Sequence, residues 1–409
     1  MVHVAVSDTS ETLVLRYADV GVATYAALRV VGRPESAVTW VIEESALGVV
    51  DSLLSAALPD PRASESIQEA LERAFTSGAF ASPAAEQHLA EALGAQLIPA
   101  EAWELIVGQS AARHCTLFVG PTGRLAQVPW ALLADPGDGN RRLLDLADIL
   151  MAAPPNIANA VRTPARWEQR RDHGPRLLVL DPRVPGQRPD SALGSVLGRP
   201  DPGSALTRHF DDLRARRRVL PEVAATVELF RNPHADRNWL ATQLIRAPSR
   251  LLFVGHATAA DGDLGHAARA SLHLADEQPL TAADLMTAKL EIPPRAALLA
   301  CSSGGDYRFD EATGLVAALI LGGAVVVTAT LWSLPTAAGY RRFATAADAS
   351  HDPMSEVVIA VDIAHEAEDA GHAVNAWQRS QLHRWHTGDV AASPVYWAAL
   401  VTFAVDGAR

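Results

Sequence analysis

The sequence predicts an α/β protein built around a large, mostly parallel sheet with helices on both faces. Short apolar runs recur along the chain and are separated by segments with helical spacing, an alternation that is typical of parallel sheets. These runs are too apolar to be strands with one exposed face, so we expect both faces to be covered. They lie at 115–120, 149–153, 176–182, 250–256, 296–301, 324–330 and 396–405.

The first hundred residues have a different pattern. Residues 2–46 contain alternating apolar and polar positions, which predict a small antiparallel extension, and residues 47–109 have the spacing of helices. At 409 residues the chain exceeds the roughly 250–300 residues at which a single core stops growing. We therefore expect one large domain with additions, or two halves.

Charge and cysteine content exclude several classes of protein. The chain has 35 basic and 47 acidic residues, a formal net charge of −12. Nucleic-acid binding needs surplus positive charge, so we expect no nucleic-acid partner. Two cysteines, Cys115 and Cys301, are too few for a disulfide framework or a structural zinc site. No signal peptide is visible at the start, and we expect a cytoplasmic protein.

Residues 314–332 form an uncharged stretch that is long enough to be a candidate membrane span. Gly322 and Gly323 divide it into a Leu- and Ala-rich part and a part rich in β-branched residues. A buried helix followed by a buried strand accounts for this pattern, and basic flanking residues are missing. We therefore expect no membrane span.

Residues 181–208 are rich in proline, glycine and arginine, which predicts a long loop. Within it, 182–207 is a candidate gate or processing site, and a floppy insertion is the alternative. The basic cluster at 214–218 is interpreted as a solvated helix face or as a partner-binding patch.

Two reactive side chains directly follow consecutive apolar runs: His256 after 250–255, and Cys301 after 296–300. Consecutive strands are usually neighbours, and functional groups gather at the carboxyl ends of parallel strands. A thiolate with a nearby imidazole suffices for acyl transfer. The alternatives are a small buried cysteine and a capping histidine. Metal-ligand spacings and nucleotide-binding motifs are missing, so we expect no metal and no cofactor.

Several motifs follow one another along the chain: GRLAQVPWALL at 123–133, LLFVGHA at 251–257, LTAADL at 280–285, AALLACSSG at 296–304, GLVAALILGGAVVVTATLW at 314–332 and SPVYWAALVTFAV at 393–405. In this order they resemble the CHAT domain family of caspase-like cysteine peptidases related to separase. The resemblance covers residues 47–405.

The resemblance implies a caspase-like fold in which Cys301 is the nucleophile and His256 is the general acid and base. It also implies an oxyanion hole formed by the backbone N–H groups of Cys301 and Ala257, although caspase-like enzymes usually have glycine after the histidine. Asp306 and Asp261 are candidates for a pocket that accepts a basic residue of the substrate.

Arg269, Arg295 and Arg308 allow the opposite preference, for an acidic residue. We expect a cysteine endopeptidase that acts on a specific protein substrate and that a regulatory protein partner controls. The alternative is a catalytically dormant scaffold that binds partners. The expected division of the chain is an N-terminal β extension with helices at 1–109, a pseudo-protease-like half at 110–245 and a catalytic half at 246–409.

Overall fold

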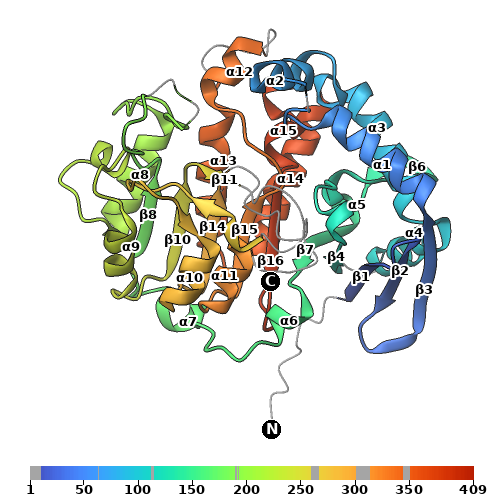
Figure 1. Ribbon diagram of the computed structural model, residues 1–409. Coiled ribbons are helices and arrows are strands. Elements are labelled where there is room, and N and C mark those ends of the chain that lie inside the picture. The colour runs from blue at the N-terminus through green and yellow to red at the C-terminus, as the bar shows by residue number, and fades with distance from the viewer. Residues whose placement is uncertain are drawn as a thin grey trace.

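The computed structural model of the chain describes residues 11–62, 64–111, 115–188, 191, 193–258, 267–300, 314–343 and 351–409 (Figure 1). One large sheet runs through the molecule, as expected for an α/β protein. In spatial order its strands are β3 (Arg33–Glu43), β2 (Ala23–Val30), β1 (Thr12–Asp19), β4 (Cys115–Gly120), β7 (Ala147–Ala152), β16 (Leu400–Ala404), β15 (Val326–Thr330), β14 (Arg295–Leu299), β10 (Arg250–Val254), β8 (Arg176–Leu180) and β9 (Val219–Leu220).

Apart from β2 and β3, which pair in antiparallel fashion, the strands of the sheet form two parallel blocks that run in opposite directions. Strands β9, β8, β10, β14 and β15 are parallel to one another, and so are β1, β4, β7 and β16. The two blocks meet where β15 pairs with β16 in antiparallel fashion. The carboxyl ends of β10 and β14 therefore lie at one edge of the sheet, and those of β4 and β7 at the opposite edge.

Helices cover both faces of the sheet (Figure 1). Helices α5, α8, α13 and α14 pack together on one face, and α10 and α11 pack on the other. The helices are α1 (Glu44–Ala57), α2 (Ile67–Thr76), α3 (Pro83–Leu97), α4 (Ala100–Ser110), α5 (Leu143–Leu146), α6 (Pro155–Ala158), α7 (Trp167–Arg170), α8 (Ala205–Arg216), α9 (Arg237–Leu244), α10 (Ala282–Ala288), α11 (Leu315–Leu321), α12 (Ala337–Phe343), α13 (Pro353–Ala364), α14 (Ala370–His386) and α15 (Pro394–Trp397).

The N-terminal region forms the expected antiparallel strands, β1 to β3, followed by helices α1 to α4. This extension is continuous with the large sheet, because β1 pairs with β4 in parallel. Helix α3 passes through Gly94, where a Cβ atom would lie 2.0 Å from the Ala134 carbonyl oxygen. The glycine thus permits close contact between α3 and β5 (Ala134–Asp135), which pairs with β6 (Asp138–Arg142).

The uncharged stretch at 314–332 is divided as expected into a buried helix, α11, and a buried strand, β15. Gly323 lies between them with φ +121°, a backbone conformation that favours glycine. Within the described residues, no helix is both long enough and apolar enough to cross a membrane.

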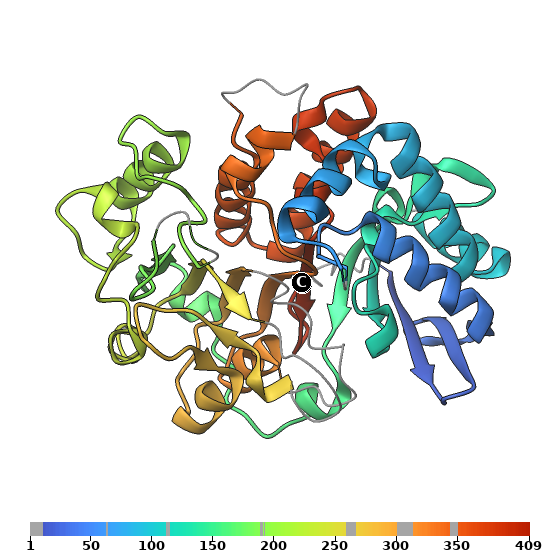
Figure 2. The same ribbon diagram turned by 45° about the horizontal axis from the view of Figure 1, so that its top comes forward.

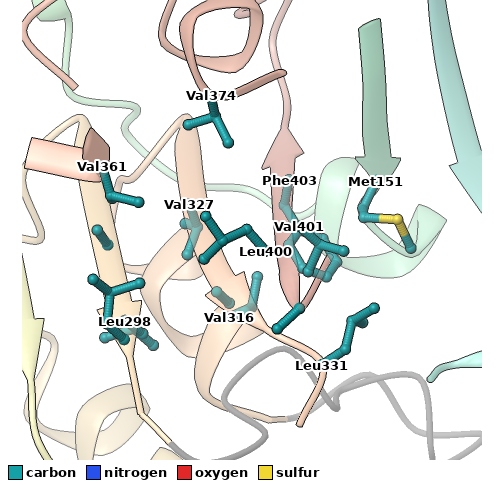
Figure 3. Close-up of a cluster of buried hydrophobic side chains, with 14 of the residues drawn as sticks. Met151, Leu298, Val316, Val327, Leu331, Val361, Val374, Leu400, Val401 and Phe403 are labelled. Carbon is teal, nitrogen blue, oxygen red and sulfur yellow. The ribbon is translucent and has the colours of Figure 1, made fainter. Parts of the chain in front are cut away.

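The core fills the space between the sheet and its helices (Figure 3). Leu298, Val327, Phe403 and Met151 come from β14, β15, β16 and β7, four neighbouring strands. Val316 of α11 packs into the same cluster. The apolar runs of the sequence are therefore central strands, whose burial stabilises the fold by roughly 25 cal/mol per Å².

Three buried arginines fix the amino ends of strands β8, β10 and β14. Arg176, Arg250 and Arg295 are the first residues of β8, β10 and β14, and they lie side by side in register. The Glu366 carboxylate accepts hydrogen bonds from Arg176 at 2.6 and 2.8 Å and from Arg250 at 2.6 Å. Arg250 also donates to Asp362 at 2.5 Å.

Arg295 is bound in a different way at this edge. Its guanidinium group donates to the carbonyl oxygens of His365 and Glu368, at 2.9 and 2.6 Å, and lies 3.8 Å from the centre of the Trp167 ring. Together the three arginines attach the segment between α13 and α14 to the sheet. The carboxyl ends of β10 and β14 lie at the opposite edge and take no part in this attachment. Functional sites of parallel sheets form at such carboxyl ends.

Candidate active site

Strands β10 and β14 are adjacent and parallel, as the sequence predicted for the runs that precede His256 and Cys301. Val254 pairs with Leu299, so His256 and Cys301 each come two residues after this pair in the sequence. The Gly255 amide donates to the Leu299 carbonyl oxygen at 3.3 Å, which extends the pairing. Cys301 itself lies outside the described residues, as do Asp261 and Asp306.

The His256 imidazole has a defined hydrogen bond. Its Nε2 atom lies 3.0 Å from the Gly194 carbonyl oxygen, which is an acceptor and has no proton to donate. Nε2 therefore carries the proton in the neutral ring, and Nδ1 has the free electron pair. Burial lowers the pKa of His256 below its ordinary value, the Gly194 hydrogen bond and Asp181 oppose that effect, and Arg231 adds to it. A neutral imidazole can accept a proton from a thiol.

The loop that carries Gly194 is attached to the sheet by Asp181, the residue after β8. The Asp181 side chain is fully buried, and its carboxylate accepts from the Ser195 hydroxyl at 2.6 Å and from the backbone amides of Val196 and Leu197 at 3.2 and 3.4 Å. Asp181 has φ +51°, a left-handed conformation that aspartate tolerates. The predicted loop is thus held in place at its centre.

Arg231 completes this arrangement. Its Nη1 atom donates to the Gly194 carbonyl oxygen at 2.9 Å and lies 3.3 Å from Oδ1 of Asp181. Arg231 and His256 therefore share one acceptor, and Asp181 balances the guanidinium charge. Asp181, Gly194 and Arg231 were not among the predicted site residues, although Asp181 directly follows an apolar run, as His256 does.

The structure shows the course of the loop predicted at 181–208 and of the basic cluster at 214–218. In the described part of 181–204 the chain forms no helix or strand, but the predicted loop extends too far, because 205–208 belong to α8. In the basic cluster, Arg214 donates to the Val223 carbonyl oxygen and Arg218 pairs with Glu222. Both arginines therefore make contacts within the chain.

Ala257 and the residues that follow it form a small sheet beside the strand ends. Strand β11 (Ala257–Thr258) pairs with β12 (Ser271–Leu272), which pairs with β13 (Leu280–Thr281). The His273 amide donates to the His256 carbonyl oxygen at 2.9 Å. Figure 2 turns this edge of the molecule toward the viewer. The small sheet thus fixes the backbone at and just after His256, and the large sheet fixes the backbone before it.

Arg295 and Cys115 lie away from this edge, whereas Arg269 lies between β11 and β12 and Arg308 is outside the described residues. Arg295 is bound at the amino end of β14, so the structure removes it from the candidates for a substrate pocket. Cys115 is buried in the core, and burial raises its pKa to about 11, as befits an inert thiol. Within the part of the chain that the structure describes, no cluster of three or more His, Cys, Asp and Glu side chains could hold a metal ion.

Comparisons with known proteins identify a family and several similar structures. A family model described as the CHAT domain matches residues 84–405. Among solved structures, separase of Saccharomyces cerevisiae, in complex with securin, is similar over 96% of this chain and 30% of its own, with 11% identity and a TM-score of 0.48. The chain thus spans less than a third of that separase chain.

The Arg-specific cysteine proteinase gingipain R is also similar, over 79% of this chain and 67% of its own, with 9% identity and a TM-score of 0.41. A complex of the pro- and mature domains of RgpB from Porphyromonas gingivalis gives a similar match, with 10% identity, 77% and 71% of the two chains covered, and a TM-score of 0.41. No curated protein matches the sequence.

Proposed function

Because the chain belongs to the CHAT domain family, we propose that it is a cysteine endopeptidase with Cys301 as nucleophile and His256 as general acid and base. The observation that best supports the proposal is the hydrogen bond from Nε2 of His256 to the Gly194 carbonyl oxygen. It orients a neutral imidazole at the carboxyl end of β10, beside the strand that leads to Cys301.

The proposed reaction has two steps. The Cys301 thiol gives its proton to Nδ1 of His256, and the thiolate attacks the carbonyl carbon of the scissile peptide bond. The C–N bond breaks, the amine leaves with the proton from His256, and a thioester remains. Water then loses a proton to His256 and hydrolyses the thioester, which restores the thiol. The backbone N–H groups of Cys301 and Ala257 are proposed to bind the oxyanion.

We further propose a protein substrate cleaved after a basic residue, with Asp306 and Asp261 in the pocket. Arg295 was one of the arginines that could favour an acidic substrate residue. Because it is bound at the amino end of β14, the case for that preference is weaker. Fluorogenic peptides that differ in the residue before the scissile bond test this point. Faster cleavage after arginine than after aspartate is expected, and the reverse order contradicts the preference.

The 182–207 segment is proposed as the regulatory element, because it contains Gly194, the acceptor for His256. A partner or a cut that displaced Gly194 would break the hydrogen bond that orients the imidazole and should therefore lower activity. N-terminal sequencing after incubation tests processing: a new N-terminus within 182–207 supports a cut, and an intact chain that cleaves substrate contradicts it.

Peptidase activity is tested by profiling cleavage of a peptide library and of cell extracts. The wild-type protein should cleave, and both Cys301→Ala and His256→Ala should abolish cleavage. Cys115→Ala is the matched control, because the Cys115 thiol is buried away from the site. Activity that persists in Cys301→Ala contradicts the proposal. A biological effect that survives in this variant favours the dormant scaffold.

A further inference from the structure

A cavity of about 600 Å³ lies at the edge of the sheet opposite to His256. It is lined by residues of β1 between Val14 and Asp19, by Arg29 of β2, by 120–123 at and after the end of β4, and by residues between 152 and 159, at the end of β7 and in α6. Figure 1 shows α6 at the lower edge of the molecule, far from α12 at the upper edge. Ligands of open α/β sheets bind outside the carboxyl ends of parallel strands, and β1, β4 and β7 meet this condition.

Two arginines line the cavity from neighbouring strands. Arg16 of β1 and Arg29 of β2 lie on the same face of the sheet, since Arg29 pairs with Val14, two residues before Arg16. A Cβ atom at Gly120 would lie 3.6 Å from Cγ and 4.0 Å from Nε of Arg16. The Arg16 side chain therefore extends over the end of β4 toward β7.

Neither guanidinium group is paired within the part of the chain that the structure describes. Both side chains are exposed, and no hydrogen bond or ion pair joins either of them to any residue that the structure describes. Many other arginines of the chain are paired: Arg124, just after the cavity-lining Gly123, forms two hydrogen bonds with Glu44. Two adjacent unpaired guanidinium groups repel each other, and an oxyanion between them would remove that cost.

A second, independent feature is the Thr122 hydroxyl, which also belongs to the lining. Its oxygen is buried, and none of the described residues hydrogen-bonds to it. Buried hydroxyls are normally paired, and this one has no partner among the described residues beside the cavity. The Asp19 carboxylate is the acidic group of the lining, and one of its oxygens already accepts from the Gly21 amide at 2.7 Å.

We propose that this cavity binds a small molecule with a phosphate or carboxylate group, held by Arg16 and Arg29. Planar guanidinium groups bind both kinds of oxyanion through paired hydrogen bonds. The volume lies within the range of about 300–1,000 Å³ that is typical of small-molecule sites. The site is separate from the proposed peptidase centre and does not depend on that activity.

Isothermal titration calorimetry of the full chain with pyrophosphate, adenosine monophosphate and citrate tests the proposal. At least one probe should bind with a stoichiometry near one. Binding of pyrophosphate or adenosine monophosphate indicates a phosphate ligand, and binding of citrate alone indicates a carboxylate ligand. Arg16→Gln and Arg29→Gln should each weaken binding about tenfold or more, because each removes charge-assisted hydrogen bonds. Higher salt should weaken binding as well.

Arg124→Gln is the matched control, since it removes an exposed arginine near the cavity that does not line it. It should bind the probe as the wild-type protein does. Circular dichroism should show that all three variants are folded, because neither cavity arginine makes an ion pair with a residue that the structure describes. Equal affinity in wild type and Arg16→Gln, or no binding of any probe up to about 10 mM, overturns the proposal.

Discussion

The Nε2 atom of His256 lies 3.0 Å from the carbonyl oxygen of Gly194, a residue in a loop 62 positions earlier in the chain. Arg231 donates to the same oxygen, and Asp181 holds the loop from a fully buried position. The orientation of the proposed general base thus depends on a carboxylate and a guanidinium that do not contact His256 directly. This dependence leads to the first two predictions.

Asp181→Asn should reduce peptidase activity about 10- to 100-fold, because it loosens the loop that positions His256. It should also lower the free energy of unfolding by about 1–3 kcal/mol, since the loop amides lose an ionised acceptor. Enzyme assays and urea unfolding measure the two effects. Asp201→Asn, an exposed position on the same loop, is the control and should change neither. Unchanged activity in Asp181→Asn would show that the loop has no positioning role.

The pKa of His256 should move in opposite directions in two variants. Asp181 raises this pKa and Arg231 lowers it, so Asp181→Asn should shift it down and Arg231→Gln should shift it up. Nuclear magnetic resonance of a protein with ¹⁵N-labelled histidine follows the titration and reports which ring nitrogen carries the proton. Shifts of the same sign in both variants, or a proton on Nδ1 in the neutral wild-type ring, contradict the arrangement described.

Asp362→Ala should destabilise the fold by about 3–5 kcal/mol, because it leaves Arg250 buried without one of its two partners. Glu222→Ala, which removes the exposed partner of Arg218, should cost about 0–1 kcal/mol. Urea unfolding followed by circular dichroism compares the two variants. Equal losses would mean that the arginines at the amino edge contribute no more than surface ion pairs do.

Stability should begin to fall below pH 6.5, partly because of His365. Burial lowers its pKa to about 3, from an ordinary value of 6.5. The unfolded chain therefore binds a proton near pH 6.5 that the folded chain excludes until about pH 3, and protonation favours unfolding across this window. His365 alone should cost about 2 kcal/mol between pH 7 and 5.

His365→Gln removes the titrating group and should flatten the stability curve between pH 6.5 and 5. Its amide can still hydrogen-bond to Thr328, whose hydroxyl lies 2.8 Å from Nε2 of His365. Unfolding free energies measured at several pH values test this point. A variant with the same slope as wild type would show that His365 does not contribute to acid sensitivity.

The fold could be predicted from the sequence because apolar runs and glycine breaks are local signals. The runs before His256 and Cys301 predicted adjacent strands, and Gly322-Gly323 predicted the change from helix to strand. The attachment of the loop could not be predicted, because Asp181, Gly194 and Arg231 are far apart in the sequence and follow no periodic pattern. In the sequence, Asp181 is simply an acid at the start of a loop.

The sequence does contain a pattern that could have predicted the arginines at the amino edge. Three of the apolar runs begin with arginine, as RLLVL, RLLFV and RAALL, and parallel strands in register bring such positions together. The pattern indicates that Arg295 has a structural role. Because Arg295 is close to Cys301 in the sequence, it was instead considered for the substrate pocket. The N-terminal extension was predicted as antiparallel, but its parallel pairing with β4 depends on tertiary contacts alone.

The central claim, that His256 activates Cys301, is tested most directly by the rate of Cys301 alkylation with iodoacetamide as a function of pH. Mass spectrometry follows Cys301, with Cys115 as a buried internal control whose pKa of about 11 should keep it unreactive. We predict rapid modification of Cys301 near neutral pH and a rate at least about tenfold lower in His256→Ala. A Cys301 that reacts like an ordinary thiol in the wild-type protein, at a rate unchanged in His256→Ala, would contradict the account.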